Sequence, residues 1–430
     1  MINPQGKHLV EGSHWVSPLN FDPEVTSAFD FPKPLGLISS TLRKVRYTAG
    51  ATTTTDGFLR IAAALDEVGI RDESLNLDWW GDDEPNRGEL ELVREILGGG
   101  FGFTVNVYAD TLLGDGTGEP GGKRTVDLLL GLGARVIAPG IVQAPDDEAR
   151  ARQFRQLADV VEYAHGCGLT VTVTVTLAQA GRRDFARMLA AANEAIALGA
   201  TRLDRMDSTS SLSPEAMAVF IRRFRAGLHR PVPLTMHVHD DFGLGTAAAI
   251  AAAGAGAGPD VSVNGASYRC GFPPLEEVVT SLEVLYGVDT GIAVGKLQWI
   301  SDLVAREMGL PNAALKPVTG GYAFLKHTPG DVLAALTHGI GTFPPISGCV
   351  HPSVTGAPAR WVWDSLSTPA MARQLAANLG LDLDEAGLRA LRADLDAAVA
   401  AIDGYPRWLE PAAVEAVARR TAQRLGETGE

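Results

Sequence analysis

Two histidines stand two residues apart in the run TMHVHDDFGLG, residues 235–245. The start of this run has the apolar pattern of a β-strand, so Thr235, His237 and His239 are expected to share one face. Two imidazoles at this spacing can converge on one metal ion, although two ligands alone do not hold one. The alternative is a pair of core histidines, which is costly in an apolar interior unless backbone or water satisfies them.

Strand-like and helix-like segments alternate over about 230 residues around this pair. The strand-like segments are 36–42, 74–80, 101–108, 134–140, 169–176, 201–206, 233–239 and 260–266. Eight strand–helix units favour a closed (β/α)8 TIM barrel, in which the histidines would lie at the C-terminal, active-site end of their strand. An open doubly wound sheet is the alternative, but no GxGxxG follows the first strand, which disfavours its dinucleotide-binding form.

The flanking segments differ in character from this alternating region. Residues 1–34 are polar and irregular and predict an N-terminal arm, and residues 35–292 form the barrel. Residues 293–365 combine one helical pattern with stretches rich in Gly and Pro, which predicts a linking subdomain. Residues 366–430 are helical in pattern. The expected fold is therefore an α/β TIM barrel with a C-terminal α-helical extension.

Composition limits the class of protein. Hydrophobic residues make up 46% of the chain and charged residues 20%, as in globular proteins. A net charge of -14 argues against nucleic-acid or anionic-membrane partners, which need a basic surface. Three scattered cysteines without CxxC spacing, and an N-terminus without an apolar signal segment, predict a cytoplasmic location.

Several stretches in order resemble the DRE-TIM metallolyase superfamily, which includes homocitrate, 2-isopropylmalate and citramalate synthases and HMG-CoA lyase. They are SSTLRKVRYTAG (39–50), HVHDDFGLGTAAAIAAAGAG (237–256) and KPVTGGYAFLKHTPGDV (316–332). The resemblance implies a pyruvate carboxyltransferase-like TIM barrel. The third stretch resembles the subdomain of the synthase branch, and related synthases are homodimers, so a homodimer is expected.

The chain departs from the family at the metal site. The family holds a divalent metal with an Asp after strand 1, the two strand 7 histidines and often an Asn after strand 8. His237 and His239 match, as does the arginine next to the Asp, Arg43, but Lys44 occupies the Asp position and Phe272 the Asn position. A lysine there removes a ligand and repels a cation, so whether a divalent metal binds stays open. The catalytic Glu of strand 2 falls on Asn76.

Lys44 has three interpretations. As a fixed cation it would stand in for the metal and stabilise an enolate or a polarised carbonyl. With its pKa lowered by burial and by Arg43, it would instead form a Schiff base with an oxo acid. In the third interpretation Lys44 turns outward and the site has decayed. We favour the fixed cation, and the retention of Arg43, both histidines and Arg269 argues against decay of the site.

Other residues are assigned by the same resemblance. Arg43 is expected to bind the oxo-acid carbonyl, and His327 lies near the region that supplies a catalytic histidine in the synthases. Substrate-binding candidates are Thr235, Asp207, Asn264 and Arg269, although strand-end hydrogen bonding for Asp207 and loop packing for Arg269 are the alternatives.

The predicted function is that of an acyltransferase that forms a carbon–carbon bond, with acetyl-CoA and a 2-oxo acid as substrates. The divergent pocket suggests specialised secondary metabolism. Two alternatives are a metal-independent aldolase or lyase that uses Lys44, and a non-catalytic paralogue that binds a ligand or partner.

Overall fold

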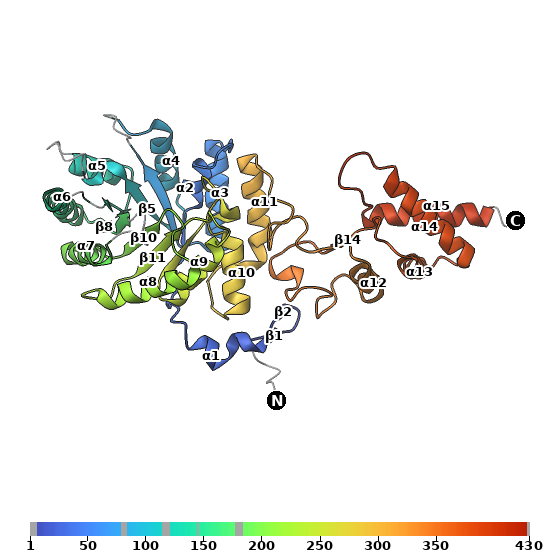
Figure 1. Ribbon diagram of the computed structural model, residues 1–430. Helices are drawn as coiled ribbons and strands as arrows, with labels where there is room; N and C mark the ends of the chain where they lie inside the picture. Colours follow the sequence, from blue (N-terminus) through green and yellow to red (C-terminus); the bar gives the residue numbers. More distant parts are fainter. Residues whose placement is uncertain are drawn as a thin grey trace. The chain divides into compact units, whose positions relative to one another are not determined.

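The computed structural model describes residues 7–78, 84–113, 121–142, 144, 146–176 and 184–427 of the 430-residue chain. The ends of the predicted segments 1–34, 74–80 and 366–430 therefore lie partly outside the described residues. The chain divides into two compact units, Leu19–Asn312 and a smaller one that joins Met1–Pro18 to Ala313–Glu430 (Figure 1).

The larger unit contains one parallel sheet that closes on itself. Its strands are β3 (Ile38–Ser39), β4 (Asp72–Leu77), β5 (Thr104–Ala109), β6 (Val136–Ile137), β7 (Gly140–Val142), β8 (Thr170–Val171), β9 (Val173–Thr176), β10 (Leu203–Asp207), β11 (Leu234–Val238) and β12 (Gly258–Val261). They run in the order β7-β9-β10-β11-β12-β3-β4-β5-β6-β8. β6 and β7 are the two halves of one interrupted strand, and β8 and β9 are the halves of the next, because β6 pairs with β8 and β7 pairs with β9. Counted in this way, eight strands close the barrel. The predicted TIM barrel is confirmed.

Helices surround the barrel (Figure 1). They are α2 (Thr41–Arg46), α3 (Thr55–Val68), α4 (Arg87–Gly98), α5 (Gly121–Gly131), α6 (Asp147–Gly166), α7 (Phe185–Leu198), α8 (Pro214–Gly227), α9 (Gly245–Gly254), α10 (Leu275–Leu285) and α11 (Leu297–Met308), with the short α1 (Pro23–Thr26) before them. Local sequence sets their ends. In α3, Thr54 accepts a hydrogen bond from the Gly57 N–H, and Gly69 ends the helix at φ 98°.

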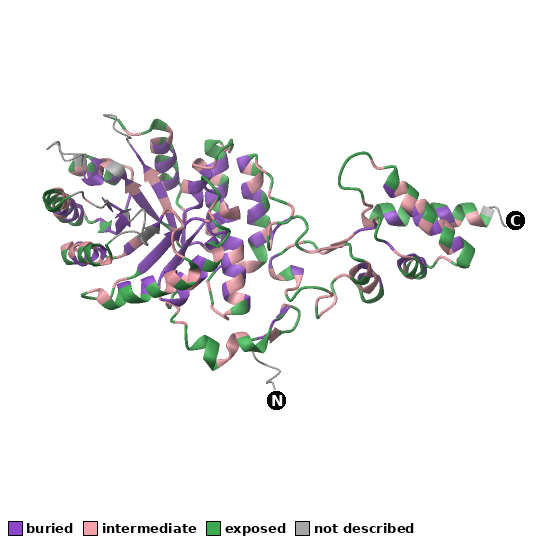
Figure 2. Ribbon diagram, in the orientation of Figure 1, coloured by how far each residue is buried: buried purple, intermediate pink, exposed green. Residues whose placement is uncertain are grey.

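The main hydrophobic core lies between the sheet and these helices rather than inside the barrel. Figure 2 shows the barrel strands buried and the outer sides of the helices exposed. TIM barrels usually fill their interior with large aliphatic side chains. Here polar side chains take much of that space, and a cavity of about 490 Å³ opens at the N-terminal ends of the strands.

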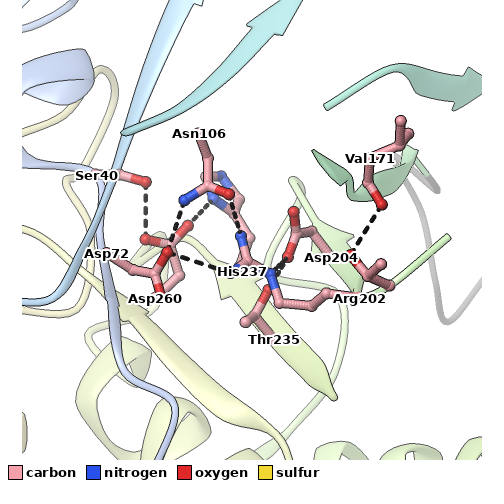
Figure 3. Close-up of polar contacts among 10 residues, drawn as sticks. Ser40, Asp72, Asn106, Val171, Arg202, Asp204, Thr235, His237 and Asp260 are labelled. Carbon is pink, nitrogen blue, oxygen red and sulfur yellow. Dashed lines mark hydrogen bonds and ion pairs between the residues drawn. The ribbon is translucent and has the colours of Figure 1, made fainter. Parts of the chain in front are cut away.

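A half-buried guanidinium organises the polar interior. Arg202 donates from Nε to Asp204 at 2.9 Å, from Nη1 to Asp72 at 3.4 Å and from Nη2 to the side-chain Oδ1 of Asn106 at 2.9 Å. Thr235 also donates to Asp204 (Figure 3). One cation thus compensates two carboxylates in this part of the barrel.

The smaller unit has its own hydrophobic cluster around Trp363, Leu391 and Val414. Its elements are β1 (Leu9–Val10), β2 (His14–Trp15), β13 (Leu325–Lys326), β14 (Arg360–Trp361), α12 (Pro329–His338), α13 (Pro369–Asn378), α14 (Glu385–Ala400) and α15 (Pro411–Glu427). The predicted C-terminal helices are present.

The two units group the predicted segments differently. Residues 7–18 pair with the C-terminal part of the chain: the Trp15 N–H donates to the Cys349 carbonyl, and the His351 N–H to the Ser13 carbonyl. Helix α11, placed in the linking subdomain by the sequence, belongs to the barrel unit, where it packs against α3. Residues 1–34 are therefore not one extended arm, since they contain β1, β2 and α1.

Candidate functional site

The histidine pair lies at the C-terminal end of β11, with His237 in the strand and His239 directly after it. Every residue of β11 is buried, because helices cover one side of the strand and interior side chains the other. His237 and His239 are 4% and 1% exposed, and their ring centroids are 5.3 Å apart. The two imidazoles therefore face a common point, as the sequence predicted.

Lys44 occupies that common point. Its Nζ lies 3.3 Å from Nε2 of His237 and 3.4 Å from Nε2 of His239. The lysine reaches this position from α2, which starts at Thr41, whereas the sequence predicted strand through residue 42. The prediction was wrong because buried Glu73 accepts a hydrogen bond from the Leu42 N–H and anchors the first turn of α2. Lys44 is 1% exposed, so it does not turn outward.

Two aromatic rings complete the surroundings of the amino group. Nζ of Lys44 lies 4.9 Å from the ring centroid of Tyr268 and 4.7 Å from that of Phe272, distances typical of cation–π contacts. The same rings pack on the histidines, with Phe272 4.6 Å from His237 and Tyr268 4.6 Å from His239. We call His237, His239, Tyr268 and Phe272 the Lys44 cage.

Hydrogen bonds on the far side of each imidazole fix its orientation. Nδ1 of His237 donates to Oδ2 of Asp260 at 2.6 Å, and Nδ1 of His239 donates to the Gly271 carbonyl at 3.1 Å. A carboxylate and a carbonyl accept only, so each Nδ1 carries the proton. Each Nε2 is then a lone-pair acceptor that faces Lys44, which donates to both.

Burial controls the protonation of these groups. Burial, followed by the charges of Lys44 and Arg43, lowers the pKa of His237 well below its usual value. The pKa of His239 is lowered to about 2, first by burial and then by His237 and the charge of Lys44. The pKa of Lys44 is also lowered, first by burial and then by Arg43. Both histidines are therefore neutral near pH 7, which suits them as acceptors for the lysine.

The residues present do not fit the divalent metal of the family. The lysine nitrogen engages the lone pair of each histidine, and the nearby Phe272 and Tyr268 offer π faces where a metal needs oxygen or nitrogen ligands. Among the residues that the structure describes, no group of three or more His, Cys, Asp or Glu side chains is arranged to hold a metal ion.

Arg43 adds a second cation next to Lys44. Its guanidinium lies 5.8 Å from the ring centroid of Tyr108. The Nε of Arg43 is buried and has no hydrogen-bond partner within the described residues. A buried donor without a partner carries a free-energy cost that an anionic ligand would remove.

The position of the family's strand 2 glutamate is Asn76 in β4, and a carboxylate lies close to its amide. Asn76 donates to Oδ2 of Asp78 at 3.0 Å and to the Tyr47 hydroxyl at 3.2 Å. Tyr47 donates to Glu89 at 2.6 Å. Position 76 thus has no carboxylate, but Asp78 provides one two residues later. The Tyr47 hydroxyl and the Glu89 side chain connect Asp78 to α4.

The remaining predicted residues have partners of their own. Asp207 accepts from the Ser211 and Leu212 N–H groups, and Arg269 makes an ion pair with Asp241 at 2.9 Å. Asn264 donates to the Ser301 carbonyl. These contacts favour a structural role in loop and strand-end bonding for the three residues. Their role in binding substrate stays a prediction.

His327 lies in the smaller unit, 3.5 Å from Asp364, so the structure does not bring it together with the other predicted residues within one unit. The sequence reasoning missed Asp260 and the contact of Tyr268 with Lys44, and it identified Phe272 only as the loss of a metal ligand. Asp260 had a usable signal, since it starts the predicted strand 260–266 next to the histidine strand.

Comparison with known proteins gives consistent matches. Residues 143–304 match the family model described as HMGL-like. The chain is 29% identical over 372 residues to a putative (R)-citramalate synthase of Methanopyrus kandleri, a match that covers 84% of this chain and 68% of that protein. It is 30% identical to the homocitrate synthase of the same organism, covering 75% and 78% of the two chains.

A 2-isopropylmalate synthase of Caldanaerobacter subterraneus is 30% identical, with 69% of this chain and 74% of that protein covered. A further putative citramalate synthase, from Methanoculleus marisnigri, is covered over 60% of its length. Among solved structures, HMG-CoA lyase from Pseudomonas aeruginosa matches with a TM-score of 0.54 at 17% identity, covering 66% of this chain and 95% of the lyase. At that identity the lyase supports the fold alone.

Proposed function

Because this chain belongs to the HMGL-like, or DRE-TIM, family together with citramalate, homocitrate and 2-isopropylmalate synthases, we propose that it condenses an acyl-CoA with a 2-oxo acid. The membership confirms the resemblance that the sequence motifs indicated, and with it the expectation of a synthase-like enzyme. Acetyl-CoA is the proposed acyl donor.

The proposed reaction forms one carbon–carbon bond. The methyl group of acetyl-CoA loses a proton, and the resulting enolate carbon attacks the C2 carbonyl of the oxo acid. The carbonyl oxygen becomes an alkoxide and takes up a proton. Water then hydrolyses the thioester, which releases a 2-hydroxy dicarboxylic acid and the free thiol of coenzyme A. Negative charge develops on an oxygen atom in both the enolate and the alkoxide, so the site must stabilise an oxyanion.

The observation that carries this proposal is the pair of cations at the barrel mouth. Lys44 lies between both histidine Nε2 atoms, and Arg43 presents a buried Nε that has no hydrogen-bond partner among the residues described. In our proposal Arg43 binds the oxo acid, and the fixed charge of Lys44 stabilises the developing oxyanion in the role that a metal has in the family. A charge that is already in place needs no reorganisation when the reaction occurs.

Restricted access to Nζ favours the fixed cation over the Schiff base. An imine requires a carbonyl carbon at bonding distance from Nζ, but Lys44 is 1% exposed and the cage surrounds it. An electrostatic field, in contrast, acts across several ångströms in a medium of low dielectric constant. The lysine-dependent aldolase or lyase is therefore the second candidate, motivated by the lowered pKa of Lys44.

We also propose, from the family resemblance, that the enzyme is a homodimer and cytoplasmic, and that His327 acts in proton transfer. Over the part of the chain that the structure describes, no helix has the length and hydropathy needed to cross a bilayer. Light scattering of the purified protein tests the dimer.

The test of function is thiol release from acetyl-CoA with a panel of 2-oxo acids, with and without a chelator. Release that survives the chelator supports the proposal, and release that the chelator abolishes would show that a metal is needed after all. If no oxo acid gives release, borohydride reduction with the same acids tests the second candidate. A mass increase on Lys44 would then identify an imine, and its absence would leave the non-catalytic paralogue.

A further inference from the structure

A buried chain of hydrogen bonds leads to Lys44 from β12. Ser40 donates to Oδ1 of Asp260 at 2.8 Å, His237 donates to Oδ2 of Asp260 at 2.6 Å, and Lys44 follows at 3.3 Å from His237. None of the four residues is more than 6% exposed. Figure 3 shows Asp260 between Ser40 and His237, pointing into the barrel.

The carboxylate decides which nitrogen of His237 carries the proton. A neutral imidazole has one N–H donor and one lone-pair acceptor. With Asp260 accepting from Nδ1, the lone pair is on Nε2 and accepts from Lys44. In the other tautomer the Nε2 proton would point at the lysine, whose hydrogens also point at Nε2, and the two donors would repel.

His239 provides an internal comparison. Its Nδ1 proton is held by the Gly271 carbonyl, a backbone group that no side-chain substitution at position 260 removes. The two histidines thus present the same acceptor to Lys44, but only His237 depends on a side chain for its tautomer.

We infer that Asp260 is a positioning residue that, through the tautomer of His237, holds the amino group of Lys44 at the centre of its cage. The inference assigns Asp260 a part in the reaction only in so far as the proposed function of Lys44 is right. Asp260 itself touches no substrate in this scheme, because His237 separates it from the cage.

Replacing Asp260 by asparagine tests this assignment. Ser40 donates to one oxygen of the carboxylate, so the single oxygen of the amide would remain with Ser40 and its NH₂ group would face Nδ1 of His237. His237 would then carry its proton on Nε2. In a serine protease triad the same Asp→Asn change, with the same tautomer reversal, lowers kcat about 10⁴-fold. For D260N we expect kcat to fall at least about 100-fold, with KM little changed.

The decisive readout is ¹⁵N NMR of histidine-labelled protein, which distinguishes the two tautomers directly. We expect the Nδ1–H form for both histidines in the wild type, and a switch to Nε2–H at His237 alone in D260N. The matched control is D204N, the same change at a carboxylate that binds Arg202 and Thr235 but not His237. D204N should leave both tautomers as they are.

The outcomes separate this inference from the proposed function. An Nε2–H form of His237 in the wild type overturns the inference without any variant, even if D260N fails to fold. An unswitched tautomer in folded D260N overturns it as well. Wild-type protein with the expected tautomers but no thiol release with any oxo acid would refute the proposed function and support the positioning of Lys44 by Asp260.

Discussion

Replacing Lys44 by methionine should separate stability from activity. Methionine has about the length of lysine without its terminal amine, so it leaves Nε2 of His237 and Nε2 of His239 without a donor. Each unsatisfied buried acceptor costs about 1–3 kcal/mol, or about 2–6 kcal/mol for the pair. The variant also no longer buries an amine whose pKa the protein interior lowers, and relief from burying a charge is worth several kcal/mol. The two effects oppose each other, so the free energy of unfolding of K44M should stay within about 2 kcal/mol of the wild type.

Activity has no such compensation. Removing one preorganised group that stabilises an oxyanion costs about 2.7–4 kcal/mol of transition-state stabilisation, a factor of about 10²–10³ in kcat. We therefore expect K44M to melt close to the wild-type temperature while thiol release falls by at least about 100-fold. Urea unfolding and the thiol assay, run on the same preparation, measure both quantities.

The control is K296M, which removes a surface lysine that pairs with Glu67 at 2.8 Å. An exposed pair contributes about 0–1 kcal/mol, so K296M should differ little from the wild type in either assay. Turnover of K44M within tenfold of the wild type would refute the role given to Lys44. A loss of activity that merely follows a loss of folded protein would refute the separation of the two effects.

Four further outcomes are expected. Burial raises the pKa of Asp260 to about 6, so below that pH the carboxylate that accepts from His237 becomes an uncharged carboxyl group, which can also donate. We therefore expect kcat to fall about tenfold per pH unit below pH 6, and a flat profile from pH 7 to pH 5 would contradict this. The double variant K44D/F272N restores the oxygen ligands of the family and should bind Mn²⁺ in calorimetry, whereas wild-type protein that binds Mn²⁺ equally well would disprove the poor fit described above. R202M leaves Asp72 and Asp204 without their cation and should lower the free energy of unfolding by about 3–5 kcal/mol in urea; a loss below 1 kcal/mol would show that the barrel interior does not depend on this ion pair. R43Q should raise KM for the oxo acid at least about tenfold and leave KM for acetyl-CoA nearly unchanged, and equal changes in both would argue against selective oxo-acid binding.

The sequence was sufficient for the parts of the structure that repeat. Eight alternations of strand and helix patterns predicted the closed barrel, and HxH on a strand predicted two imidazoles on one inward face. Periodicity of this kind is local, so it can be recognised without knowledge of distant contacts.

The surroundings of Lys44 could not be predicted in the same way. Whether residues 41–46 continue a strand or start a helix depends on Glu73, 31 positions from Leu42, and no local pattern records that bond. The cage likewise brings position 44 together with positions 268 and 272. The sequence showed Lys44 and Phe272 as losses of metal ligands, and only the geometry relates both changes to one cation and its aromatic partner.

The discontinuous smaller unit has a consequence for synthesis on the ribosome. Residues 7–18 are made before the barrel, and the segment that they pair with, Cys349–His351, follows about 330 residues later. At about 5–20 residues per second this interval lasts roughly 15–70 s. The whole barrel, residues 19–312, is translated within that interval. The order of translation thus lets the barrel fold first, and the smaller unit is completed only when both of its segments have left the ribosome.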